Sequence, residues 1–175
     1  MMLVGNFVIA LLLAFSLLII GVFDLFPATY EGNQARMGNM FSIILDYAAF
    51  CFIINFIREI VKDQQDIKGD YNHGMNTLPI VLGIARTSKV VFALSFIPIL
   101  LLLWYINKYF MNNDLYIITI YALMFIVAPL VYFTIKIWTA KSTKDFRHLS
   151  GVLKLVLLFG IISIAVLTYN IIRHA

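Results

Sequence analysis

Residues 58–83 read REIVKDQQDIKGDYNHGMNTLPIVLG, and this polar stretch follows directly on an apolar run at about residues 39–61. Its carboxylates are Glu59, Asp63, Asp66 and Asp70. Acidic groups beside an apolar helix are costly unless they line a protein interior, face water or hold a cation. The stretch therefore predicts a polar site at the mouth of a membrane helix.

The composition of the whole chain is that of a membrane protein. Of its 175 residues, 62% are hydrophobic and 13% are charged, and the mean hydropathy is +0.94. Soluble domains carry about 25% charged residues, so this chain has too little polar surface for a water-soluble core. The net charge of +4 indicates loops that face anionic lipid headgroups. We therefore expect an all-α integral membrane protein. No basic run alternates with exposed aromatic residues, so we expect no nucleic-acid partner.

Five apolar stretches are long enough to cross a bilayer, which takes roughly 20 residues. They cover about residues 3–26, 39–61, 88–110, 115–139 and 149–172. The first lacks the basic start and the small-residue cleavage site of a signal peptide, so we interpret it as a true span. We expect residues 1–175 to form a single membrane domain with a motif loop at about 62–87.

The basic residues predict how the spans are oriented. Ten of the 13 Lys and Arg residues lie near the two connections between spans two and three and between spans four and five. They are Arg58, Lys62, Lys68, Arg86, Lys89, Lys136, Lys141, Lys144, Arg147 and Lys154. Because cytoplasmic loops are enriched in basic residues, we expect the motif loop and the N-terminus on the cytoplasmic side and the C-terminus outside. The expected location is the cytoplasmic membrane of a bacterium or an archaeon.

Polar residues at the end of the second span fall on one helix face. At about 100° per residue, a narrow arc holds Asn55, Glu59, Lys62 and Asp66. Asp63 flanks this arc, and so does Asp70 if the helix continues that far. We expect the face to carry polar groups from the depth of the membrane to its surface, with Asn55 and Glu59 as supporting groups.

The spacing of three aspartates suits a hard cation. Asp66 and Asp70 are four residues apart, and Asp63 lies one turn earlier. Mg²⁺ is typically held by one or two carboxylates together with phosphate oxygens and waters. These aspartates are therefore our candidate metal ligands. The candidates for offsetting the remaining charge of a substrate phosphate are Arg58, Lys62 and Lys68.

Ordinary surface ion pairs offer a plainer interpretation of the same residues. Carboxylates can pair with neighbouring lysines at a solvated helix end without any ligand. The tripeptide Thr77-Leu78-Pro79 leaves both interpretations open, since a threonine before a proline-containing first turn is also an ordinary helix start.

In combination, these residues resemble a known family. The pattern RExxxDxxDxxGD at 58–70, followed by Gly74, Thr77-Leu78-Pro79 and Gly83, is similar to the second aspartate-rich motif of the UbiA-type intramembrane prenyltransferases. It looks closest to members that are geranylgeranylglycerol-phosphate geranylgeranyltransferases or digeranylgeranylglyceryl-phosphate synthases. Family members have nine transmembrane helices, with this motif between helices six and seven. The resemblance thus implies that the five spans correspond to helices five to nine, the C-terminal half of the fold.

The resemblance also implies a reaction. Members of the family transfer an isoprenyl group, geranylgeranyl among others, from its diphosphate to a lipid or aromatic acceptor with the help of Mg²⁺. Two aspartate-rich motifs hold the metal and the diphosphate. By position, Asp66 and Asp70 would bind metal with Asp63 as a third ligand, and Arg58 and Lys62 would face the phosphates.

One part of the family pattern is absent. The first aspartate-rich motif, of the type NDxxDxxxD, has no counterpart in these 175 residues. We therefore expect either a fragment of a longer enzyme or one chain of a split enzyme, whose missing N-terminal half a complementary chain would supply. We expect no prenyl transfer by the chain alone.

Two other classes compete with this interpretation. A CDP-alcohol phosphotransferase also uses spaced aspartates, but its DGxxAR…GxxxDxxxD pattern is absent. The second alternative is a non-catalytic multi-span membrane protein, such as a transporter fragment or a subunit of a split enzyme. A transporter is expected to show internal repeats or polar residues in several spans, whereas the chemistry here is concentrated at one helix end.

Overall fold

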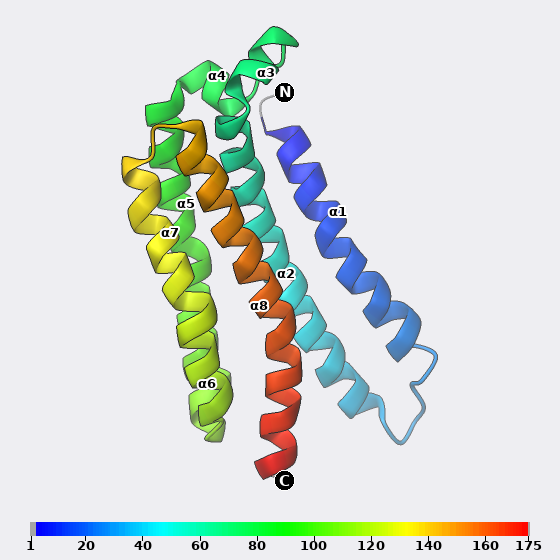
Figure 1. The fold of residues 1–175 in the computed structure, drawn as a ribbon. Helices are drawn as coiled ribbons and strands as arrows, with labels where there is room; N and C mark the ends of the chain where they lie inside the picture. The colour runs from blue at the N-terminus through cyan, green and yellow to red at the C-terminus, as the bar shows by residue number, and fades with distance from the viewer. Residues whose placement is uncertain (1–2, 175) are drawn as a thin grey trace.

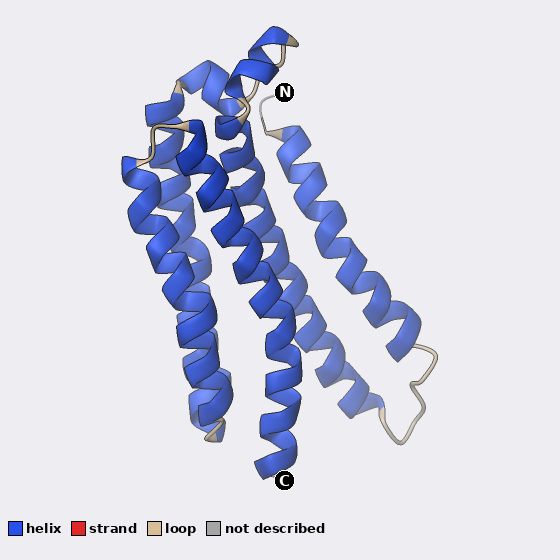
Figure 2. Cartoon of the chain, viewed as in Figure 1, coloured by secondary structure: helices blue, strands red, loops and turns tan. Residues whose placement is uncertain are grey.

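The computed structural model describes residues 3–174, and its regular structure within them is helical, with no strand (Figure 2). The helices are α1 (Val4–Ile20), η1 (Gly21–Leu25), α2 (Gln34–Gln65), α3 (Ile67–Asn72), α4 (Leu78–Leu82), α5 (Ile84–Tyr105), η2 (Ile106–Phe110), η3 (Met111–Asn113), α6 (Tyr116–Ala122), η4 (Leu123–Val127), α7 (Ala128–Thr139) and α8 (Thr143–His174).

Five continuous helical segments are long and apolar enough to cross a membrane. They are Val4–Leu25, Gln34–Gln65, Ile84–Asn113, Tyr116–Thr139 and Thr143–Arg173. This confirms the prediction of an all-α protein with five long apolar helices. The large hydrophobic side chains on the outside of the bundle, such as Leu12, Leu100, Met124 and Ile161, are exposed, as expected where hydrocarbon is the solvent.

The helices run side by side along one common direction (Figure 1). α2, α5, α8 and the α6–α7 segment form a four-membered bundle, and α1 packs against α2 at its side. α3 and α4 cap one end of the bundle, which we call the motif end, and α1 begins there as well. α8 ends at the opposite end.

The core of the bundle lies between α2, α5, α7 and α8. Its fully buried side chains include Ile57, Ile60, Phe133, Ile137 and Leu153. Because all of these residues lie in the half of the bundle nearer to the motif end, α2 is held firmly where its polar residues emerge.

The fourth apolar segment is not one regular α-helix. A π-helical turn, η4, separates α6 from α7, and Pro129 stands in the first turn of α7. Proline has no backbone N–H and cannot continue the hydrogen-bond ladder of a preceding helix, and kinks and π-bulges are the usual outcome. The sequence therefore specifies the interruption locally, while packing against α8 and α5 holds the two halves in place.

Candidate functional site

α2 ends within the motif. Its last residue is Gln65, and Asp66 leaves the helical region with φ −107° and ψ 21° before α3 begins at Ile67. The Asp66 N–H still donates to the Lys62 carbonyl at 2.9 Å, and the Asp70 N–H donates to the Asp66 carbonyl at 3.0 Å. The chain thus bends at Asp66 and helical turns continue on both sides. Helical phase on α2 therefore does not extend to Asp70.

A glycine makes room for the Asp66 side chain at this bend. A Cβ atom placed on Gly69 would lie 2.6 Å from Oδ1 of Asp66 and 3.1 Å from its Cγ. Real Cβ atoms do not approach other atoms so closely, so any other residue at position 69 would displace the carboxylate. Gly69 thus lets the Asp66 carboxylate fold over the first turn of α3.

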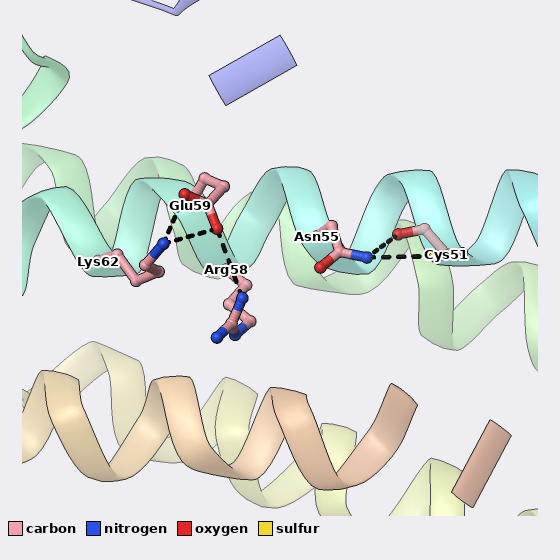
Figure 3. Close-up of polar contacts among 5 residues, drawn as sticks. All are labelled: Cys51, Asn55, Arg58, Glu59 and Lys62. Atoms are coloured by element: carbon pink, nitrogen blue, oxygen red, sulfur yellow. Dashed lines mark hydrogen bonds and ion pairs between the residues drawn. The ribbon is translucent and has the colours of Figure 1, made fainter. Parts of the chain in front are cut away.

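The buried carboxylate of Glu59 is engaged by its neighbours on α2 (Figure 3). Lys62 Nζ donates to both of its oxygens, at 3.0 Å to Oε1 and 2.9 Å to Oε2, and Arg58 Nη1 lies 3.4 Å from Oε1. Glu59 is only 6% exposed. Glu59 therefore balances the positive charge of this face, and its oxygens are already occupied.

Arg58 retains donors that could bind an anion. A guanidinium has five N–H donors, and Glu59 receives one of those of Arg58. Its buried Nε has no hydrogen-bond partner among residues 3–174. A half-buried cation with free donors is suited to a phosphate oxygen.

Asn55 lies further into the bundle and is buried. Its Nδ2 points back along its own helix and donates to the Cys51 carbonyl at 2.9 Å and to Cys51 Sγ at 3.2 Å (Figure 3). This contact satisfies the amide within α2. A further role for Asn55 in supporting the polar face stays a prediction.

Asp63 is tied to a different helix. Asn6 Nδ2 on α1 donates to Asp63 Oδ2 at 2.7 Å. Asn6 is 9% exposed. The role of Asn6 was not predicted from the sequence. A single asparagine in an apolar span is nevertheless a recognisable signal, because polar groups at membrane depth usually have a partner.

The three predicted metal ligands lie before, at and after the bend at Asp66. Among the described residues, no group of three or more His, Cys, Asp or Glu side chains is placed to hold a metal ion. Asp66 is exposed, Asp63 and Asp70 are half-buried, and the charge of Asp70 acts on Asp63. Mg²⁺ needs only one or two carboxylates when phosphate and water complete its shell, so the assignment of these aspartates as metal ligands stays a prediction.

Of the remaining predicted basic residues, Lys62 bonds an acidic side chain and Lys68 is exposed on α3. The Lys62 side chain is 46% exposed even though it bonds Glu59. Lys68 on α3 is exposed. Lys62 and Arg58 thus lie on the α2 face with Glu59, while Lys68 lies beyond the bend at Asp66.

Buried contacts brace the end of α2 against the segment that follows the motif. Gln64, which is 1% exposed, donates through Nε2 to Ser88 Oγ at 2.8 Å and to the Ile84 carbonyl at 3.3 Å. These bonds join α2 to the start of α5. They hold the residue next to the acids in one orientation, and sequence analysis did not anticipate them.

Two glycines shape the loop between α3 and α5. Gly74 has φ +67° and Gly83 has φ +81°, which are backbone conformations that other residues rarely adopt. Between them, α4 begins after Thr77 and buries Leu78 and Pro79 against the bundle. The Thr77 side chain makes no capping bond. The tripeptide therefore contributes the first residues of α4 and the buried side chains of Leu78 and Pro79.

The chain is similar to several curated digeranylgeranylglyceryl phosphate synthases from archaea. It is 32% identical over 97 residues to that of Korarchaeum cryptofilum, 38% over 88 residues to that of Thermococcus sibiricus and 28% over 120 residues to that of Methanosphaera stadtmanae. The matches cover 55%, 50% and 66% of this chain but only 30%, 26% and 41% of those proteins. The similarity thus spans about a third of the length of these relatives.

These matches confirm the resemblance that the motif predicted. No family model matches the chain, and no solved structure does either.

Proposed function

We propose that this chain provides the second aspartate-rich half of an intramembrane prenyltransferase site, which transfers an isoprenyl group from its diphosphate to an acceptor. The similarity to digeranylgeranylglyceryl phosphate synthases supports isoprenyl transfer. The observation that carries the proposal is the placement of free acidic oxygens and a spare guanidinium at one end of an apolar bundle. A lipid diphosphate needs the same combination of a polar clamp and an apolar environment.

In this proposal, the acidic residues of the motif would bind the metal ion and the basic residues would bind the diphosphate. The oxygens of Asp66 and Asp70, with Asp63 as a third donor, would hold Mg²⁺. When bound, Mg²⁺ neutralises charge that develops on a departing diphosphate. Arg58 would donate to a phosphate oxygen, and Lys62 and Lys68 would offset its remaining charge. The apolar helices around this end would exclude water from the reacting carbon.

Glu59 would position the two basic residues next to it rather than bind the metal. Its carboxylate holds Lys62 and Arg58 on the face that would receive the diphosphate. Because the two cations share one anion, the group of Arg58, Glu59 and Lys62 keeps one positive charge. This group can attract a phosphate, and its desolvation costs less than that of two unpaired cations.

The site would be completed by polypeptide outside these 175 residues. In the proposed arrangement, a first aspartate-rich motif comes from an N-terminal half, on the same chain or on a complementary one. The five helices correspond to helices five to nine of the nine-helix fold, with the motif end on the cytoplasmic side. The chain alone would then bind part of the substrate without transferring the prenyl group.

A non-catalytic role is the second candidate. It is favoured by the ion pairs of Glu59 with Lys62 and Arg58, which neutralise much of the α2 face without a ligand. In that case the motif end would be a solvated helix terminus of a membrane subunit.

Reconstitution with the missing motif separates the two candidates. The chain is co-expressed with the N-terminal helices of an archaeal relative and assayed with radiolabelled geranylgeranyl diphosphate and either glycerol-phosphate or aromatic acceptors. We expect Mg²⁺-dependent transfer that Asp66→Asn or Asp70→Asn reduces about 100-fold or more, as is usual when a group that stabilises the transition state is removed. Asp24→Asn, at an exposed acid of η1, is the matched control.

Two outcomes would contradict the proposal. One is the absence of transfer while the matching halves of the relative itself, co-expressed in the same way, are active. The other is a near-normal rate in both aspartate variants.

A further inference from the structure

A pocket of about 380 Å³ lies at the motif end, where α5 begins and α7 ends (Figure 1). Its walls are the first turns of α5, the last turn of α7 and the connection from α7 to α8. The lining includes Ile84, Ala85, Ser88, Lys89, Trp138 and Lys141. The acids of the motif contribute nothing to this lining, so the pocket is separate from the proposed metal site.

The pocket carries the charge of two lysines that no carboxylate neutralises. Lys89 lies on α5, and Lys141 lies on the connection from α7 to α8. Among residues 3–174, the ion pairs all involve Glu59 and its neighbours on α2. The nearest acid along the chain, Asp145, instead accepts the backbone N–H groups of Lys141 and Ser142. Since a cleft lined by charges of one sign concentrates the opposite sign, this pocket selects an anion.

The start of α5 adds hydrogen-bond donors to the pocket. Ile84 and Ala85 line it from the first turn, whose backbone N–H groups have no partner within the helix. Ser88 lines it as well and is only 4% exposed. Gln64 Nε2 donates to Ser88 Oγ and to the Ile84 carbonyl, so the hydroxyl proton of Ser88 points away from Gln64 and remains available to another acceptor. Phosphate oxygens suit such a group of donors.

The surface beside the pocket is aromatic and faces outward. Trp138 is 56% exposed, and its ring packs against that of Phe92 with the centroids 4.8 Å apart. Phe92 packs in turn against the exposed Phe96, one turn further along α5, at 5.1 Å. Tryptophan favours the boundary between lipid headgroups and hydrocarbon. A ligand that places phosphate in the pocket and hydrocarbon beside these phenylalanines therefore fits both surfaces.

The structure assigns this pocket to the headgroup of an anionic phospholipid from the leaflet at the motif end. Its phosphate lies between Lys89 and Lys141 and accepts from Ser88 and the first turn of α5, while its acyl chains follow Phe92 and Phe96. Basic pockets between membrane helices are a known setting for anionic headgroups. The site is independent of the proposed prenyl transfer, because no residue of the acidic motif lines it.

Trp138 provides a reporter inside the pocket. The chain has two tryptophans, so Trp104→Phe leaves Trp138 as the sole indole fluorophore. The full chain with this substitution is placed in phosphatidylcholine vesicles at physiological salt. Part of the lipid is then replaced by brominated phosphatidylglycerol or, in parallel, by brominated phosphatidylcholine. Because bromine quenches the indole on contact, the quenching at each lipid fraction gives the relative affinity of the two lipids for this position.

We expect phosphatidylglycerol to be preferred about tenfold, because each lysine beside an anionic headgroup contributes severalfold. Lys89→Gln and Lys141→Gln should each lower this preference about threefold or more. Ala85→Leu, which narrows the pocket at an exposed position without a change of charge, should lower it by a similar factor. Lys136→Gln is the matched control, since this exposed lysine of α7 does not line the pocket and lies about 200° around the helix from Trp138. It should leave the preference unchanged.

Other results would overturn the assignment. Equal affinity for the two lipids, or an equal loss of preference in Lys136→Gln and the lysine variants of the pocket, would leave only diffuse attraction to a basic end. An unchanged preference in Ala85→Leu would mean that the lysines act without the pocket. Soluble glycerol phosphate in excess should not reverse the quenching, and reversal would assign the pocket to a soluble phosphate compound. Loss of prenyl transfer in the reconstituted enzyme would not bear on this result.

Discussion

Asn6 of α1 donates a 2.7 Å hydrogen bond to the Oδ2 atom of Asp63 on α2, across 57 positions of the chain. The bond joins the first apolar helix, which packs against α2 at the side of the bundle, to the face that carries the motif. It also occupies one oxygen of Asp63 and leaves Oδ1 for another ligand. α1 is thus positioned to orient an acid of the candidate site.

This bond predicts an energetic coupling between the two residues. In a double-mutant cycle with Asn6→Ala and Asp63→Ala, we expect a coupling free energy of about 1 kcal/mol, which is typical of one intramolecular hydrogen bond. The free energy of unfolding is measured by titration with sodium dodecyl sulfate in mixed micelles. Asn39→Ala, at an exposed position of α2, serves as the control partner. A coupling as small as that of the control would mean that the bond does not stabilise the packing of α1.

Metal binding should depend on diphosphate. Because the described residues offer no group of three acidic or imidazole side chains placed around one ion, we expect the purified chain to bind Mn²⁺ weakly. Inorganic diphosphate should tighten this binding about tenfold or more, since phosphate oxygens complete the coordination shell. Electron paramagnetic resonance of free Mn²⁺ measures both affinities.

Asp66→Asn and Asp70→Asn should remove most of this diphosphate-dependent gain, whereas Asp24→Asn should keep it. Tight Mn²⁺ binding without diphosphate would argue for a closed protein site. An unchanged gain in both variants would remove Asp66 and Asp70 from the proposed ligands.

The contact between Gly69 and the Asp66 carboxylate gives a prediction that changes no charge. In Gly69→Ala, the new methyl group would lie 2.6 Å from Asp66 Oδ1 unless the carboxylate moves. We expect the gain in Mn²⁺ affinity on adding diphosphate to fall by about the factor seen in Asp66→Asn.

Gly151→Ala is the comparison variant, because a Cβ atom on Gly151 would meet nothing within 4 Å. It should leave metal binding unchanged and raise stability by about 0.5–1 kcal/mol, the usual advantage of alanine over glycine inside a helix. Normal metal binding in Gly69→Ala would show that the position of the Asp66 carboxylate is unimportant for the site.

Local patterns account for much of the architecture. Runs of apolar residues predict the long helices because their length must match the bilayer. Helical phase correctly groups Glu59 with Lys62, since both lie on the regular part of α2. Helical phase does not extend past Asp66 to Asp70, because the backbone of Asp66 leaves the helical region between α2 and α3.

Contacts between distant segments could not be read from the sequence. The bond of Asn6 to Asp63 and those of Gln64 to the start of α5 depend on how separate helices pack. The pocket with Lys89 and Lys141 likewise forms where α5 meets the connection from α7 to α8. The residue pattern within one helix does not indicate which residues of another helix it will contact.

The orientation of the bundle in the membrane can be tested with introduced cysteines. Cys51 is the only native cysteine, so Cys51→Ala provides a background without thiols. Lys68→Cys and Glu31→Cys place exposed thiols at the motif end and at the opposite end. Because the connections at the motif end carry most of the basic residues, we expect Lys68→Cys to face the cytoplasm.

In intact cells, a membrane-impermeant maleimide should therefore label Glu31→Cys, and it should label Lys68→Cys only after the membrane is permeabilised. Labelling of both thiols in permeabilised cells controls for their reactivity. The reverse pattern would place the acidic motif outside. That result would be incompatible with a substrate diphosphate supplied from the cytoplasm, since such a headgroup would have to cross the bilayer to reach Asp66 and Asp70.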